Sequence, residues 1–516
     1  MRKAFLAAGF AGLLGLCSPA HGATGETVAG VDGKWRHYQS LHFELFSHRG
    51  DTRSRELLHN LELLRAVFFD TLQLKEIRPV EISIFYFDSE RVFRVYTPAE
   101  MRKSGLAAFY LNRADRAVIV ISPQQDSEES QRIIFHEYIH HLTTISGDTP
   151  ALWYVEGIAE LFSTIEEERD GMVLGRPIPA HIDVLQLQAS MPLEWLFSVR
   201  HGSPVYNENT LNGLFYAESW ALLHYWYFGS SKLPHEKVED FLRHVRHEGE
   251  AGDSNQRREL FQQMTGMDYP AMGKLLHDYV INGRFGERKM PAPKIAPRES
   301  YTVRQVARDE IREQLTELDF RVNRSPAAKL ALLNRLEKTP GDVRPYEILG
   351  SDALQDGDDS IARERWQEAI AAGTQNPAIF HELALLESRR WFSEFDLLYF
   401  RLPDETARYL RDLLKRSIKS APNQRQAYEM LAWVEATAEV PSVANVNLVQ
   451  KHFPELKEKY QTMVALALVR LHLKDEATAR KILDDLEQMP PPTPPFVQKS
   501  TATLRAFMDA QHPVTP

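Results

Sequence analysis

Two histidines and a glutamate stand at a spacing that can hold a metal ion. Residues 135–142 read FHEYIHHL and place His136 and His140 four residues apart. On a helix, residues four apart lie on one face, so both imidazoles can direct a ring nitrogen at one ion. Zinc accepts imidazole and carboxylate ligands. Glu137 lies one position further round the helix, where it can take a proton from a water molecule that the zinc activates for attack on a carbonyl.

The same three residue types also occur on solvated helix faces, so the neighbouring residues decide between the two interpretations. Four large apolar side chains surround the motif: Ile133, Ile134, Ile139 and Leu142. They predict a largely buried helix, and buried polar groups require partners. A metal ion would supply the partner that both imidazoles need, and we therefore expect a metal site.

A catalytic zinc site takes three protein ligands and leaves one position for water. Residues 148–150 (DTP) predict a helix start, with a cap followed by proline at the first helical position. The helix that follows reads ALWYVEGIAELF over 151–162, with Glu156 and Glu160 on one face of an otherwise apolar pattern. Gly157 would let the two predicted helices approach closely. One of the two carboxylates would complete the metal site.

The two segments together resemble the signature of a known group. HExxH followed by WxxEGxAE is typical of gluzincin (MA-clan-like) zinc metallopeptidases, and the resemblance extends over roughly residues 35–285. It implies one Zn²⁺ per chain, with Glu156 as the third ligand beside His136 and His140. Glu160 would orient a ligand or a helix end. The spacer of 15 residues before Glu156 is shorter than in the best-known members, which keeps Glu160 open as the ligand.

The resemblance also implies two features around the metal. Members of the group commonly pair an extended substrate with an edge strand, for which residues 105–110 (GLAAFY) are the candidate and an ordinary strand is the alternative. They also bring a Tyr or His from a later helix to the oxyanion of the reaction. Tyr216 is the candidate here, and simple packing beside Phe215 is the alternative. We expect His141 and His224 to be structural histidines.

The segments around the motif predict the fold class α+β. Residues 43–47 and 80–87 have strand patterns, the second with apolar residues in alternation. Residues 107–111 and 117–122 flank the turn sequence NRAD and predict a hairpin, whereas residues 53–72 carry apolar side chains at helical spacing. We expect a gluzincin-like peptidase domain over residues 24–288, with a small mixed sheet and active-site helices.

The pattern changes after this domain. Residues 289–297 (KMPAPKIAP) hold three prolines in nine residues, so residues 289–325 are predicted to be a linker and connecting helix. Residues 326–516 resemble tetratricopeptide repeats, with a generic array of α-hairpins as the alternative. Prolines at 490–492 and 494–495 are expected to end the array. The positions that carry the resemblance are Leu349, Gly350, Ala362, Trp366, Ala369, Leu410, Leu414, Ser417, Pro422, Tyr428, Leu431, Ala432, Leu466, Ala467, Ala479, Leu483 and Leu486.

Residues 1–23 have the pattern of a signal peptide: a basic start, an apolar stretch and small residues before the cleavage site. A buried N-terminal helix is the alternative. Cleavage would remove Cys17, the only cysteine, and with it any disulfide or thiol chemistry. We expect a periplasmic or secreted bacterial protein, with lipid attachment at Cys17 as a second possibility.

Charge and hydropathy narrow the range of partners. The formal net charge of −10 gives no electrostatic reason to expect nucleic acid or an anionic membrane. From residue 24 onward no segment approaches the roughly 20 apolar residues of a membrane span. The expected partners are a peptide or protein substrate and a protein bound by the repeats.

Three functions remain open at this point. The first is zinc-dependent peptide-bond hydrolysis with Glu137 as general base, in which the repeats recruit a protein substrate or partner. The second is a non-catalytic periplasmic scaffold that binds through its helical repeats, which a loss of Glu137 would have favoured. The third is hydrolysis of a non-protein amide, such as a cell-wall cross-link, by the same chemistry.

Overall fold

The chain of 516 residues forms two compact units in a computed structural model. One unit comprises Met1–Lys75 and Glu81–Leu332, the other Glu76–Val80 and Leu333–Pro516. The predicted signal peptide, Cys17 and the expected cap at 148–149 lie outside the described residues. The structure describes residues 28–76, 80–99, 101–102, 106–123, 128–146, 150–203, 212–229, 235–248, 254–392, 397–456, 459–488 and 495–511.

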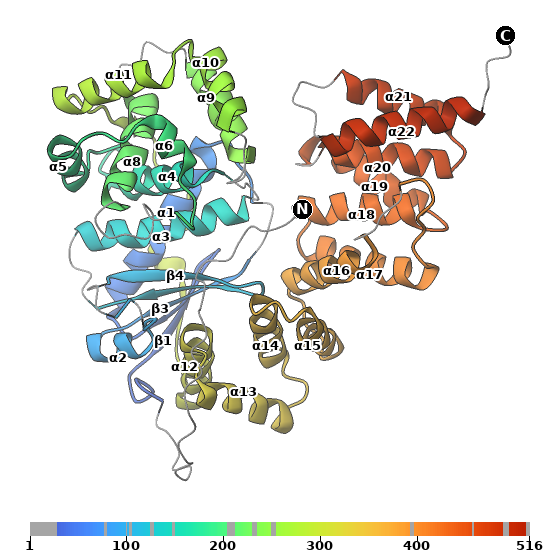
Figure 1. The fold of residues 1–516 in the computed structure, drawn as a ribbon. Helices are drawn as coiled ribbons and strands as arrows, with labels where there is room; N and C mark the ends of the chain where they lie inside the picture. Colours follow the sequence, from blue (N-terminus) through green and yellow to red (C-terminus); the bar gives the residue numbers. More distant parts are fainter. Residues whose placement is uncertain are drawn as a thin grey trace, which may run out of the picture. The chain divides into compact units, whose positions relative to one another are not determined.

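A six-stranded mixed sheet organises the first unit (Figure 1). Its strand order is β4-β5-β3-β2-β1-β9, so β4 lies at one edge. The strands β2, β3 and β5 run parallel, whereas β4 and β5 form the predicted antiparallel hairpin. The strands are β1 (Arg36–Gln39), β2 (Glu44–Ser47), β3 (Ile82–Tyr86), β4 (Ala108–Asn112), β5 (Ala117–Ile121) and β9 (Thr302–Gln305).

The alternation predicted for β3 is wrong, because all five of its residues are buried. A parallel strand in the middle of a sheet is covered on both faces, so it needs no polar face. Phe85 belongs to a core cluster with Leu315 and Leu318 of α12 (Arg308–Asn323). Helices α1 (Asp51–Thr71) and α3 (Glu128–Ile145) pack against strands of the same sheet.

The segment predicted as a linker and connecting helix, 289–325, belongs to the first unit instead. Its strand β9 pairs with β1, and α12 lies in the core described above. Arg321 of α12 forms a buried ion pair with Asp115 in the β4–β5 turn. All four residues of β9 are exposed, so the strand lacks the apolar pattern by which a sequence reveals a strand.

The helices that carry the motifs are α3 and α4 (Leu152–Ser163), which pack against each other. Helix α4 begins after Ala151 as its N-cap, so Pro150 precedes the helix rather than occupying its first position. Gly157 lies against α8 (Asn212–Phe228), not against α3 as expected. A Cβ atom at Gly157 would lie 2.6 Å from the carbonyl oxygen of Ser219, so glycine permits the close packing of α4 on α8.

The first unit also contains a second sheet and further helices. Strands β6 (Glu166–Glu168), β7 (Gly171–Leu174) and β8 (Arg288–Met290) form a second sheet. The other helices are α2 (Glu90–Val95), α5 (Pro179–Leu187), α6 (Leu193–Ser198), α9 (His235–Glu248), α10 (Ser254–Thr265), α11 (Tyr269–Asn282) and the 3₁₀ turn η1 (Arg298–Ser300).

The second unit is built of paired helices, of which α14–α15, α16–α17 and α20–α21 pack most closely. A Cβ atom at Gly350 would lie 2.5 Å from the indole of Trp366, so glycine makes room for this side chain. Helix α22 begins at Pro495 and packs on α20, so the helical array continues beyond the point at which it was expected to end; residues 490–494 lie outside the described residues. The helices are α13 (Pro326–Lys338, which spans the boundary), α14 (Val343–Gln355), α15 (Asp359–Ala371), α16 (Pro377–Phe392), α17 (Asp404–Ser420), α18 (Arg425–Thr437), α19 (Val443–His452), η2 (Phe453–Glu455), α20 (Lys459–His472), α21 (Glu476–Glu487) and α22 (Pro495–Gln511).

Within the described parts of the chain, no helix combines the length and hydrophobicity that a membrane span requires.

Candidate metal site

Helix α3 sorts the residues of the first motif onto two faces. Phe135, Tyr138 and Ile139 are buried against the rest of the unit. The side chains of His136 and His140 keep 16% and 23% of their surface exposed, so neither ring is fully buried. The helical spacing therefore presents two imidazoles on one accessible face, as the sequence predicts.

Glu156 of α4 meets both imidazoles. Its Oε2 atom lies 3.3 Å from His136 Nε2 and 3.5 Å from His140 Nε2, and the two Nε2 atoms are 3.0 Å apart. Ligands bound tetrahedrally at zinc distances are separated by about 3.3 Å. The three donor atoms thus have the separations of one face of a tetrahedron. Among the described residues, these three form the one group of such side chains close enough to hold a metal ion.

Glu160 lies on the other side of the His136 ring. Its Oε1 atom is 3.3 Å from Nδ1 of His136, whereas its Oε2 atom contacts Arg132 at 3.2 Å and His181 Nε2 at 3.0 Å. Burial raises the pKa of Glu160, but the positive charges of His136 and His181 outweigh it and hold this pKa well below its usual value. Glu160 is therefore an ionised partner of His136 and stands outside the group of three donors.

The sequence analysis did not identify Arg132 or His181 as residues of the site. Arg132 stands four residues before His136 on α3, so helical spacing could have identified it as a neighbour of the metal face. His181 lies on α5, which carries neither motif, and no local pattern connects it with the site.

Glu137 is held by the edge strand. The backbone N–H of Tyr110 in β4 donates a hydrogen bond to the Glu137 carboxylate. Burial raises the pKa of Glu137 to about 7; His136 opposes the rise, and Glu156 adds to it. A carboxylate with a pKa near neutral pH is suited to accept and return a proton. The expected edge strand is described from residue 108, and the earlier part of the predicted segment, at 105, lies outside the described residues.

The imidazoles differ in their electrostatic surroundings. Burial lowers the pKa of His140 to about 4, although the charge of Glu156 opposes this, so His140 is neutral at pH 7. Burial also lowers the pKa of His136, but the charges of Glu160 and Glu156 raise it well above the ordinary value. A metal ion bound here would therefore take the place of a proton on His136.

Tyr216 of α8 lies beside His136. The centre of its ring is 6.1 Å from that of His136, and the two rings meet edge to face at 82°. Tyr216 therefore lies close to the HExxH motif, as its candidate role requires. His141 and His224 serve the core: His141 Nδ1 is 3.1 Å from the Tyr110 hydroxyl, and His224 lies between a tyrosine hydroxyl and a backbone carbonyl.

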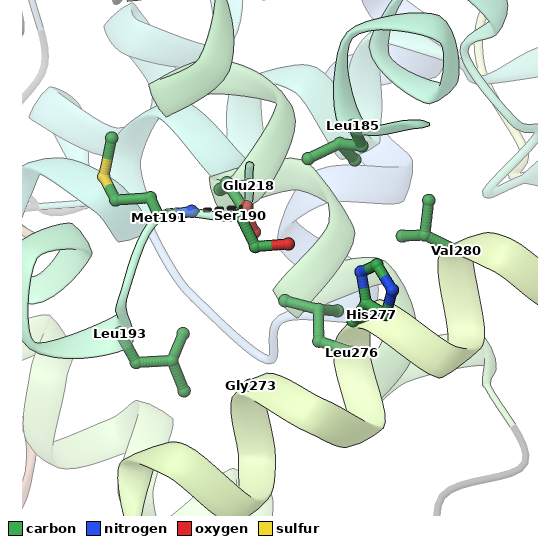
Figure 2. A pocket seen from close by; sticks show the side chains of 9 residues that line it. All are labelled: Leu185, Ser190, Met191, Leu193, Glu218, Gly273, Leu276, His277 and Val280. Carbon is green, nitrogen blue, oxygen red and sulfur yellow. Dashed lines mark hydrogen bonds between the residues drawn. The ribbon is translucent and has the colours of Figure 1, made fainter. Parts of the chain in front are cut away.

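A separate pocket lies between α5, α6, α8 and α11, and Figure 2 shows the side chains that line it. Glu218 of α8 is 2% exposed there and accepts a hydrogen bond of 2.9 Å from the Met191 amide. It follows Tyr216 by two residues and therefore points about 200° away around the helix. None of the pocket residues is a predicted site residue. The lining consists of Leu185, Ser190, Met191, Leu193, Glu218, Gly273, Leu276, His277 and Val280.

We expect Glu218 to make the stability of the first unit dependent on pH. Burial raises its pKa from 4.5 to about 7, against the lowering effect of the Met191 amide. The folded state therefore favours the protonated carboxyl, and this stabilisation is lost as the pH rises through 7. Glu218→Gln keeps an acceptor for the amide without a charge. We expect the advantage of this variant over wild type to grow by about 2–3 kcal/mol between pH 5 and pH 8.

Urea unfolding at the two pH values measures this change. Glu259→Gln on α10 is the matched control, because Glu259 is exposed. An advantage of Glu218→Gln that is the same at both pH values would show that the carboxyl is ionised in the folded protein throughout.

No family model matches the chain, and a search of curated proteins gives no match. The interpretation of the site therefore depends on its own geometry and on the two sequence motifs.

Proposed function

We propose that the chain is a zinc-dependent peptidase in which His136, His140 and Glu156 bind the metal and Glu137 is the general base. One observation carries the proposal: the three donor atoms lie 3.0–3.5 Å apart, as zinc ligands do, directly beside a carboxylate with a pKa of about 7. Two imidazoles and a carboxylate are ligands typical of zinc. Magnesium and calcium bind oxygen ligands instead, so this set of donors favours zinc.

Zinc, when bound, supplies a Lewis acid that polarises a carbonyl group and lowers the pKa of water. Glu137 takes the proton of the attacking water and returns it to the leaving amine. The hydrogen bond from the Tyr110 backbone N–H fixes the orientation of the Glu137 carboxylate for this proton transfer. His136 presents Nε2 toward the metal position because its Nδ1 faces the Glu160 carboxylate.

The surroundings of the site suit an extended peptide. Strand β4 lies at the edge of the sheet, next to Glu137, and an edge strand offers backbone hydrogen bonds to a substrate in β conformation. Such binding uses the main chain and selects little among side chains. Tyr216 is the candidate that would stabilise the oxyanion of the tetrahedral intermediate, because its ring lies beside His136.

The resemblance to gluzincins supports the same reaction and implies the same ligand roles. The predicted signal peptide supports action in the periplasm or outside the cell, and the paired helices of the second unit would recruit a protein substrate or partner. Intact Glu137 favours an enzyme over a scaffold that binds without catalysis.

Removal of the metal tests the proposal. We expect the purified chain to cleave peptides in a proteome-derived library, read by mass spectrometry. A chelator should lower the rate by more than about 100-fold, since the uncatalysed reaction is far slower. One equivalent of zinc, but not magnesium, should restore it. Cleavage that persists in the chelator would contradict the metal mechanism. A zinc-loaded chain that cleaves no peptide would contradict the peptidase and leave the scaffold and the hydrolysis of a non-protein amide.

A further inference from the structure

The carboxylate of Glu160 is the meeting point of two helices. From α3 it receives His136 Nδ1 at 3.3 Å and the Arg132 guanidinium at 3.2 Å. From α5 it receives His181 Nε2 at 3.0 Å, the shortest of the three contacts. Glu160 itself is 8% exposed, so these donors replace most of the water that an ionised carboxylate would otherwise bind.

The contact with His136 determines which nitrogen of that ring can bind a metal. A carboxylate at Nδ1 keeps the proton on this atom and leaves the lone pair on Nε2. Nε2 is the atom that lies 3.3 Å from Glu156 and 3.0 Å from His140. The orientation of the Glu160 carboxylate therefore decides whether His136 presents its lone pair to the metal position.

The start of helix α5 and its packing on α8 place His181 next to the Glu160 carboxylate. Pro179 stands in its first turn, where proline fixes the start of a helix, and the preceding Ile178 is buried. The ring of His181 lies 5.8 Å from that of Trp220 on α8, and α5 packs along α8. His181 is thus placed by the core and not by the motif helices.

We propose that His181 is a positioning residue of the metal centre, which acts through Glu160 to orient His136. This inference rests on the proposed metal site. Arg132 alone would leave the Oε2 atom held from one side, and the carboxylate could turn away from Nδ1 of His136. With His181 in place, side chains from both helices contact it. Helix α5 therefore belongs to the metal centre although it supplies no ligand.

The test measures zinc affinity by competition with a chromophoric chelator, using the full-length chain. His181→Ala should weaken zinc binding by about 10- to 100-fold, the usual effect of a residue that orients a ligand. His181→Gln, whose side-chain amide can donate to Glu160, should recover part of the loss. Asp183→Ala is the control, because Asp183 is exposed on the same helix.

A second comparison separates positioning from a general loss of structure. In a Glu160→Gln background, His181→Ala should have little further effect on zinc affinity, since both changes interrupt the same chain of contacts. If His181→Ala lowers zinc affinity by the same factor in the Glu160→Gln background as in wild type, the inference is overturned. Equal affinities of wild type and His181→Ala would overturn it as well. A wild type that binds no zinc would instead overturn the metal site itself, and the proposed function with it.

Discussion

Replacement of Glu137 by glutamine is expected to lower peptide cleavage by about 10²- to 10⁴-fold, the contribution typical of a general base. Glutamine has nearly the same shape and still accepts the hydrogen bond from the Tyr110 amide. It cannot take a proton from water, so only the chemical step is lost. The measurement is kcat/KM on a peptide from the cleavage library, together with zinc content.

The control for this variant is Glu129→Gln, because Glu129 is exposed in the first turn of the same helix, two turns before His136. Zinc content should equal that of wild type in both variants. Loss of zinc in Glu137→Gln would show that Glu137 binds the metal directly, and an unchanged kcat/KM would assign the base to another residue.

The part of the site that is local in sequence could be predicted from the sequence. Helical periodicity places His136, Glu137 and His140 on one side of α3, and a second periodic segment supplies Glu156. These four residues come together because two adjacent helices pack, which a short connection favours. The hairpin of β4 and β5 was likewise predictable, since its turn lies between two apolar runs.

The part that depends on contacts between distant segments could not be predicted. His181 reaches Glu160 only because α5 packs on α8, and no spacing in the sequence expresses that contact. Gly157 was expected to serve the packing of α3, yet it lies against Ser219 of α8. A glycine indicates that something approaches closely without saying which element does so.

The predicted end of the first unit, at residue 288, was wrong for a similar reason. The prolines of 289–297 are typical of a linker, but strand β9 joins the sheet through backbone hydrogen bonds, for which an exposed strand needs no apolar side chains. Helix α12 then covers the sheet through Ile311, Leu315 and Leu318. The first unit consequently extends to Leu332 rather than ending at residue 288.

The two glutamates of α4 should differ sharply in what they contribute to metal binding. Glu156→Gln removes the charge of the proposed third ligand, so we expect zinc affinity to fall by more than about 100-fold. Glu160→Gln alters only the orientation and basicity of His136, for which a loss of about 10- to 100-fold is usual. The zinc dissociation constants of the two variants, measured by chelator competition, show which change weakens binding more.

This comparison also decides between the two carboxylates that the short spacer left open. Glu156 Oε2 lies 3.3 and 3.5 Å from the two Nε2 atoms, whereas Glu160 faces Nδ1 of His136. A larger loss in Glu160→Gln than in Glu156→Gln would move the third ligand one helical turn along α4. Retention of the apo-protein melting temperature in both variants shows that the change in affinity does not arise from unfolding.

Every proposal above depends on one zinc ion held between His136, His140 and Glu156. The zinc content of the purified full-length chain, after exposure to micromolar zinc and removal of the excess, tests this directly by inductively coupled plasma mass spectrometry. We expect about one zinc per wild-type chain and almost none in the His136→Ala/His140→Ala variant. A folded wild type that retains no more zinc than this variant would contradict the proposed site.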